Sequence, residues 1–246
     1  ALGLTLVFSA LGLICGSEIL VPKLTNLHSE DHRTEAARQV KSAFTLRAMF
    51  SALGVALLLM YALLKEPSST VLTLLFFAVS MLLNEPFGVM VAWFQARTFN
   101  RPKVMVVISG LALKVFIIFT LFQNGVSSTH WFAAAWSAES LFIAGLFFAL
   151  YRHRFGDLEM SAGIDWVEVR NLFKDGLPFF GGLMFMLLFQ KMDLLLLRKL
   201  SSPETLGLYA AAQQVTLGMT AFSTVVCISL APSAGLPDFK SQGNNP

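Results

Sequence analysis

The chain has 246 residues, of which 55% are hydrophobic and only 13% are charged, and its net charge is +3. Soluble domains carry about 25% charged and about 45–50% apolar residues. The composition therefore excludes a disordered chain and argues against an ordinary soluble enzyme. The 23 Phe residues and the mean hydropathy of +0.66 are typical of long helices in lipid.

Seven apolar stretches are long enough to cross the hydrocarbon core of a bilayer, which takes about 20 helical residues. None of them alternates with the period of two that a membrane β-strand shows. The sequence therefore predicts an all-α fold, a polytopic membrane helix bundle with seven transmembrane helices. In chain order, these helices are expected over residues 1–21, 43–64, 69–96, 104–123, 131–151, 176–197 and 206–231.

The basic residues predict the orientation of these helices. Twelve of the 18 Lys and Arg residues lie in or beside alternate connections, which the positive-inside rule assigns to the cytoplasm. The connections 65–68, 124–130 and 198–205 are then expected outside. The first helix would run inward, and the chain opens within an apolar run that lacks a signal-peptide pattern. We therefore expect a fragment of a larger membrane protein, with a disordered or unrelated polar tail over residues 232–246.

The segment 152–175 is predicted to be a cytoplasmic linker. Trp166, Val169 and Phe173 recur at helical spacing, which indicates an amphipathic helix at the membrane interface. A plain long loop is the alternative. The residues 176–178, Gly-Leu-Pro, are expected to break the path before the sixth span. The predicted organisation is a first lobe over residues 1–151, the linker, and the first two helices of a second lobe over residues 176–231.

Two ionisable residues are expected at similar depth in consecutive antiparallel helices. Lys114 lies near the middle of the fourth span and Glu139 near the middle of the fifth. Charges inside a membrane are costly and mark either internal pairs or functional pathways. Either the two form a buried ion pair, or Lys114 faces a water-filled cavity and meets an anionic substrate. Both hold if Glu139 positions Lys114.

Five further ionisable residues lie within or near the spans. Glu85 precedes a proline, which indicates a kink with exposed carbonyls, and it either faces the bundle interior or forms a cation or proton site. Lys191 and Asp193 point about 200° apart on one helix, so at most one lines a cavity. Asp193 alternatively pairs with a neighbouring helix. Glu18 and Arg47, near cytoplasmic ends, either snorkel or line a pathway.

Motifs for enzymatic chemistry are missing from the sequence. It contains no phosphate loop, no HExxH, no GxSxG and no glycine-rich filter loop. Cys15 and Cys227 lie far apart in apolar runs, and His28 and His32 lie in a charged stretch where a solvated helix face outweighs a metal site. We expect no catalytic residue, no metal, no cofactor and no nucleic-acid partner.

Several segments resemble a known family. LGLICGSEILVPKL and the later SAFTLRAMFSALGVALLL are similar to its second and third helices, and WFQARTFNRPKV is similar to the end of the fourth. FKDGLPFFGGLMFMLLFQKMDLLLLRKLSSPETLGLYAAAQQV resembles the seventh helix, an outer loop and the start of the eighth. The family is that of bacterial lipid-linked oligosaccharide flippases, the O-antigen and polysaccharide exporters of the multidrug/oligosaccharidyl-lipid/polysaccharide superfamily. It implies twelve to fourteen helices in two lobes, of which this chain would hold about helices two to eight.

The resemblance implies transport without catalysis. The substrate would be an undecaprenyl-pyrophosphate-linked oligosaccharide, moved from the cytoplasmic to the outer leaflet of a bacterial inner (plasma) membrane for polysaccharide, O-antigen or lipopolysaccharide biosynthesis. A proton or sodium ion as coupling ion, the bilayer and a polysaccharide polymerase machinery are the other expected partners. The candidates for contacting the pyrophosphate or sugar are Lys114, Lys191 and Arg47. The candidates for coupling or charge pairing are Glu139, Glu85, Asp193 and Glu18.

Two alternatives stay open. A multidrug/ion antiporter of the same superfamily would need an acidic cavity. A non-transporting membrane scaffold subunit would use its buried charges only as ion pairs. A membrane enzyme is the least expected class, because no loop presents a cluster of catalytic carboxylates or His residues.

Overall fold

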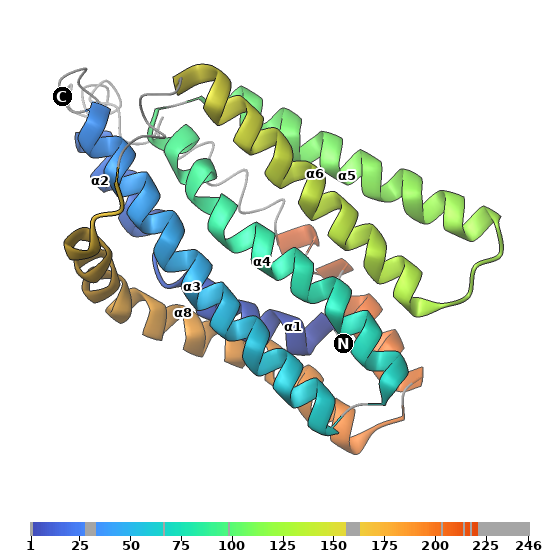
Figure 1. Cartoon of the computed structure of the whole chain (residues 1–246). Coiled ribbons are helices and arrows are strands. Elements are labelled where there is room, and N and C mark those ends of the chain that lie inside the picture. Colours follow the sequence, from blue (N-terminus) through green and yellow to red (C-terminus); the bar gives the residue numbers. More distant parts are fainter. Residues whose placement is uncertain are drawn as a thin grey trace, which may run out of the picture. The chain divides into compact units, whose positions relative to one another are not determined.

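The computed structural model describes residues 2–27, 33–65, 67–97, 99–155, 163–202, 204–213, 215–216 and 218–220, and it contains no strand among them. The predicted all-α class is therefore confirmed. The helices, in chain order, are α1 (Leu2–Ser9), the short 3₁₀ helix η1 (Ala10–Leu13), α2 (Ser17–Asn26), α3 (Arg33–Lys65), α4 (Ser68–Ala96), α5 (Asn100–Gln123), α6 (Thr129–Phe155) and α8 (Trp166–Leu200) (Figure 1).

Six segments of the described chain are long and apolar enough to cross a membrane. They are Thr5–Asn26, Thr34–Lys65, Thr70–Ala96, Arg101–Gln123, Thr129–His153 and Trp166–Phe189. They correspond to the first six predicted spans, so a polytopic membrane helix bundle is confirmed. The seventh predicted span, 206–231, extends beyond the described residues and stays a prediction, and the predicted tail 232–246 lies wholly outside them.

The chain divides into two compact units, residues Ala1–Lys191 and Met192–Pro246. In the first unit, α4 packs between α3 and α6, and α5 packs on the other side of α6 (Figure 1). The core of this unit lies around Trp93 and Phe94 of α4, which are 2% and 1% exposed. The same buried cluster includes Leu20 of α2, Leu46 of α3, Val106 of α5, Phe147 of α6 and Leu172 of α8, so six helices share one buried centre.

The first predicted span is interrupted rather than continuous. The helix α1 tightens into η1, the chain then leaves helical geometry, and α2 restarts after Gly16, whose ψ of 171° is extended. Gly12 lies in the interruption, where a Cβ would come within 2.6 Å of Glu85 Cγ on α4. The lack of a side chain at Gly12 therefore lets α4 approach the interruption closely, and the free carbonyls there need partners from other helices.

The predicted break at residues 176–178 is wrong, because Pro178 lies inside the continuous helix α8. A proline inside a helix costs about 3 kcal/mol, but neighbouring helices re-satisfy the freed backbone in a membrane. Tertiary packing holds the first turns of α8: Leu172 is fully buried, and the Phe173 ring stacks on Phe50 with centroids 5.6 Å apart. The predicted amphipathic segment is thus the beginning of the sixth span. Of its apolar face, Val169 is buried, whereas Trp166 is 61% exposed.

Candidate functional site

A charged pair joins α5 and α6 halfway along the two helices. Lys114 Nζ lies 2.8 Å from Glu139 Oε2, and the two side chains are 15% and 14% exposed. Both residues lie about ten residues from the connection 124–128. At 1.5 Å per residue this is about 15 Å, half of a hydrocarbon core of about 30 Å. The predicted ion pair is confirmed, and it lies at the depth where charge is most costly.

An aromatic ring, Trp136, completes the surroundings of Lys114. The ammonium lies 4.2 Å from the centroid of the indole ring, which makes a cation–π contact. Trp136 precedes Glu139 by one helical turn, so the ring and the carboxylate share a face of α6. This i, i+3 spacing could have been read from the sequence, but it was missed. On α5, a Cβ at Gly110 would come within 2.5 Å of Ile143 Cγ1, so glycine at this position lets the two helices approach closely.

Arg47 lies in the interior of the bundle and contacts the main chain. Its side chain is 5% exposed, Nε donates to the carbonyl of Cys15 at 2.7 Å, and Nη1 donates to the carbonyl of Glu85 at 3.1 Å. A Cβ at Gly88 would come within 2.6 Å of Nη1, so the absence of a side chain there makes room for the guanidinium. The Arg47 side chain therefore joins the interruption of the first span to α4. Its contact with substrate stays a prediction.

Two predicted acidic residues are placed differently from each other. Glu85 lies in α4 over Gly12, and its own carbonyl accepts a hydrogen bond from Arg47. The carbonyl that Pro86 deprives of its helical donor is that of Leu82, four residues before the proline. Glu18 is exposed in the first turn of α2. It lines a pocket of about 460 Å³ together with Ser17, Val21, Pro22 and Gln95. The structure does not bring Glu18 or Glu85 together with the Lys114 pair.

Asp193, in the second unit, accepts hydrogen bonds from the following helical segment. Its Oδ2 accepts from the Tyr209 hydroxyl and, at 3.1 Å, from Gln213 Nε2. The predicted alternative, that Asp193 pairs with a neighbouring helix, is confirmed. Tyr209 and Gln213 were missed, although their i, i+4 spacing places them on one helix face. The side chain of Lys191 lies outside the described structure.

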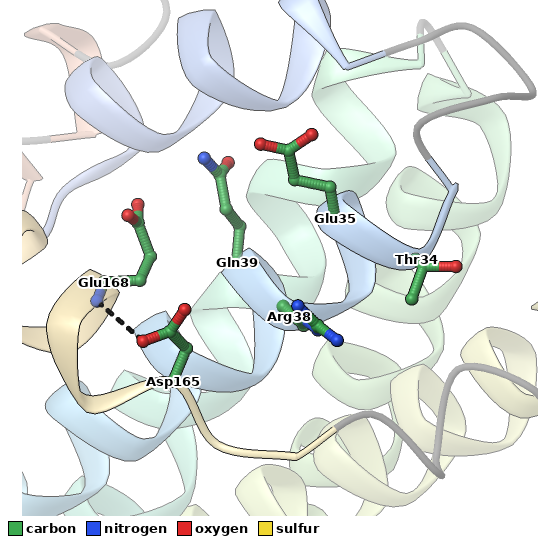
Figure 2. A pocket seen from close by; sticks show the side chains of 6 residues that line it. All are labelled: Thr34, Glu35, Arg38, Gln39, Asp165 and Glu168. Carbon is green, nitrogen blue, oxygen red and sulfur yellow. Dashed lines mark hydrogen bonds between the residues drawn. The ribbon is translucent and has the colours of Figure 1, made fainter.

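A polar pocket of about 340 Å³ lies at the predicted cytoplasmic end, between the beginnings of α3 and α8 (Figure 2). Its lining residues are Thr34, Glu35, Arg38, Gln39, Asp165 and Glu168. Asp165 caps α8, because its Oδ1 accepts from the backbone N–H groups of Val167 at 2.9 Å and Glu168 at 3.3 Å. The pocket was not foreseen, since its two walls are more than 120 residues apart in sequence.

A salt bridge continues this polar region beside the pocket. Lys23 Nζ of α2 lies 2.8 Å from Asp175 Oδ2 and 3.8 Å from Glu168 Oε1, both on α8. Within the part of the chain that the structure describes, no three His, Cys, Asp or Glu side chains gather as metal ligands. The pair His28 and His32 lies outside the described residues.

Six membrane-crossing helices with charges paired inside the spans define a multi-pass membrane protein. A family model described as polysaccharide biosynthesis protein matches residues 23–232, which is most of the chain. The chain belongs to this family, in agreement with the resemblance to polysaccharide exporters, and it is thereby a membrane protein of polysaccharide biosynthesis. No curated protein and no solved structure matches the chain.

Proposed function

We propose that this protein acts in a flippase that moves undecaprenyl-pyrophosphate-linked oligosaccharide from the cytoplasmic to the outer leaflet of a bacterial inner membrane. The observation that carries the proposal is the Lys114–Glu139 pair at half the depth of the spans of a polysaccharide biosynthesis protein. A pyrophosphate cannot cross hydrocarbon without a compensating charge, because an unpaired buried ion costs several kcal/mol at least. A lysine at this depth supplies that charge.

The resting pair suggests how the substrate would be received. With Glu139 at 2.8 Å, the Lys114 ammonium is neutralised while no substrate is bound. The pyrophosphate oxygens would replace the carboxylate as partners of the ammonium, while the Trp136 ring keeps the ammonium in place. The released Glu139 would take up a proton or a sodium ion, which couples the exchange to an ion gradient. Glu85, Asp193 and Glu18 stay secondary candidates for coupling, and Lys191 and Arg47 for substrate contact.

The first test removes the cation from the full-length protein in cells. Lys114→Ala should abolish surface-polysaccharide export while the amount of protein in the membrane stays unchanged. The matched control is Lys65→Ala, which removes an exposed lysine at the far end of α3 and should export normally. Normal export by the Lys114 variant at normal abundance would exclude this residue from transport.

The second test separates the substrate role from a purely structural one. Each single swap, Lys114→Glu or Glu139→Lys, places like charges side by side, whereas the double swap restores an ion pair of opposite direction. We expect the double swap to recover membrane abundance but not export, because the cation then projects from α6 instead of α5. Full recovery of export would mean that the pair only joins the helices, as expected of a scaffold.

A further inference from the structure

The polar pocket between the beginnings of α3 and α8 contains two buried oxygen atoms without hydrogen bonds. Gln39 Oε1 belongs to the α3 wall and Glu168 Oε1 to the α8 wall, and neither accepts a hydrogen bond within the described part of the chain. Lys23 Nζ lies 3.8 Å from Glu168 Oε1, which is an ionic contact but too long for a hydrogen bond. Buried acceptors are almost always paired, so these two oxygens indicate donors that the pocket receives from a ligand.

The acceptor groups of the pocket lie on one side of its helices. Glu35 and Gln39 are four residues apart, so they share a face of α3. Figure 2 shows their tips on the same side as the tip of Glu168, whereas Arg38 projects from another part of α3. One side of the pocket therefore combines two carboxylates with an amide oxygen, and it offers hydrogen-bond acceptors and negative charge.

Helix capping explains the acidic residues of the pocket only in part. Asp165 caps α8, and Glu35 and Glu168 lie in the first turns of α3 and α8, where a carboxylate interacts favourably with the helix dipole. Capping requires no glutamine at position 39, and it gives no reason to bury an oxygen of Glu168 without a hydrogen bond. The hollow and its two unpaired oxygens therefore need a further explanation.

The volume and the polar groups of the pocket select a class of ligand. Its volume of about 340 Å³ lies within the range of small-molecule pockets, about 300–1,000 Å³. No three His, Cys, Asp or Glu side chains gather as metal ligands in the part of the chain that the structure describes. An anion would meet carboxylates from both walls, whereas a primary ammonium group brings a positive charge and three hydrogen-bond donors. The pocket therefore fits a small organic cation.

We propose that this pocket is a binding site for a small primary-amine cation, such as an amino sugar or a polyamine. Its ammonium group donates to Gln39 Oε1 and Glu168 Oε1, and the carboxylates of Glu35 and Asp165 add negative charge around it. Because the two acceptors belong to α3 and α8, the bound amine joins these helices at the predicted cytoplasmic end. The site does not involve the Lys114–Glu139 pair and does not depend on the transport proposal.

The test measures the binding of three probes to the purified full chain by isothermal titration calorimetry, at a pH where the amines are protonated. The probes are glucosamine, putrescine and glucose, which has hydroxyl groups but no amine. We expect saturable binding of both amines and none of glucose. Tighter binding of glucosamine than of putrescine would identify an amino sugar as the source of the ammonium group, and the reverse order a polyamine. Equal binding of glucose and glucosamine, or no saturable binding of either amine, would overturn the proposal.

The variant Gln39→Leu separates a binding role from a structural one. It removes a buried, unpaired oxygen at similar volume, so the thermal stability of the free protein should stay equal or rise. The affinity for both amines should fall about tenfold, because a hydrogen bond to a charged group is lost. The matched control is Gln95→Leu, which changes a half-buried glutamine in the pocket beside Glu18 and should keep the wild-type affinity. An unchanged affinity of Gln39→Leu would overturn the proposal.

A second variant, Glu168→Gln, keeps the shape of the α8 wall and removes its charge. We expect the affinity for both amines to fall about tenfold or more, whereas the exposed control Glu204→Gln should bind like the wild type. Equal losses in these two variants would mean that the amines bind by the general charge of the protein, which contradicts the proposal. Displacement of glucosamine by equimolar Mg²⁺ would also overturn it, because the pocket would then be a metal site.

Discussion

Replacing Arg47 with Met tests whether its buried guanidinium stabilises the interrupted first span. The substitution leaves the carbonyls of Cys15 and Glu85 without the donors that now lie 2.7 and 3.1 Å away. The Glu85 carbonyl lies inside α4 and keeps the helical N–H four residues later, whereas the Cys15 carbonyl lies where the chain leaves helical geometry. Leaving that one buried carbonyl unsatisfied costs about 1–3 kcal/mol. Removing a buried charge recovers part of this cost, since guanidinium burial is itself unfavourable. We therefore expect a local loss of about 1–2 kcal/mol.

Cys15 provides the assay, because it lies in the interruption and is 0% exposed. In a Cys227→Ser background it is the only thiol, and its labelling rate by a maleimide reports opening of this region. A loss of about 1–2 kcal/mol raises that rate by roughly 5- to 30-fold. Arg38→Met, an exposed change on the same helix, is the control. A labelling rate equal to that of the wild type would refute the reasoning that Arg47 holds the interruption closed.

Two glycine substitutions in α8 have contrasting expected outcomes, and one lysine substitution should have a small effect. Gly176→Ala places a Cβ against the carbonyl of Ile14, so it should lower the free energy of unfolding by about 1–3 kcal/mol, measured by thermal melting in detergent. Gly181→Ala places a Cβ in open space, so it should be neutral or stabilising. Lys23→Met breaks the bond to Asp175, but the lysine side chain is 30% exposed and its partner 52%. The loss in the free energy of unfolding should stay below about 1 kcal/mol, measured by the same melting curves. A larger loss would contradict the argument that solvent screens this ion pair.

The positions of the spans could be predicted from the sequence, because the length of an apolar run and the thickness of a bilayer are both simple constraints. The relative depth of Lys114 and Glu139 could also be predicted, because both lie about equally far from the same short turn. In two antiparallel helices joined by a turn, residues at equal distances from the turn lie side by side. The pairing then followed from the cost of leaving either charge alone in lipid. The length of a helix and the free-energy cost of a charge in lipid can both be judged from a short stretch of sequence. These two quantities were enough to predict the spans and this ion pair.

The partners of Arg47 could not be predicted in the same way. Its donors reach backbone carbonyls 32 and 38 residues away, and carbonyls have no sequence signature. One of them is free only because the first span leaves helical geometry at residues 14–16, which depends on how α4 packs over Gly12. The predicted break at residues 176–178 was wrong for the same reason: α8 continues through Pro178 because burial of Leu172 by other helices outweighs a local preference.

The described geometry distinguishes two kinds of buried cation, and this distinction ranks the substrate candidates. Arg47 bonds two main-chain carbonyls, and the main chain cannot move aside as a side chain can. An anion that recruited the guanidinium would therefore leave the Cys15 carbonyl, which lies outside helical geometry, unsatisfied. Lys114 bonds a carboxylate on a flexible side chain, which can be replaced by a phosphate oxygen and neutralised by a proton. An exchange of anions at Lys114 conserves the number of charge pairs in the membrane, whereas an exchange at Arg47 does not. The physical argument therefore favours Lys114 as the group that a pyrophosphate would meet at mid-membrane depth.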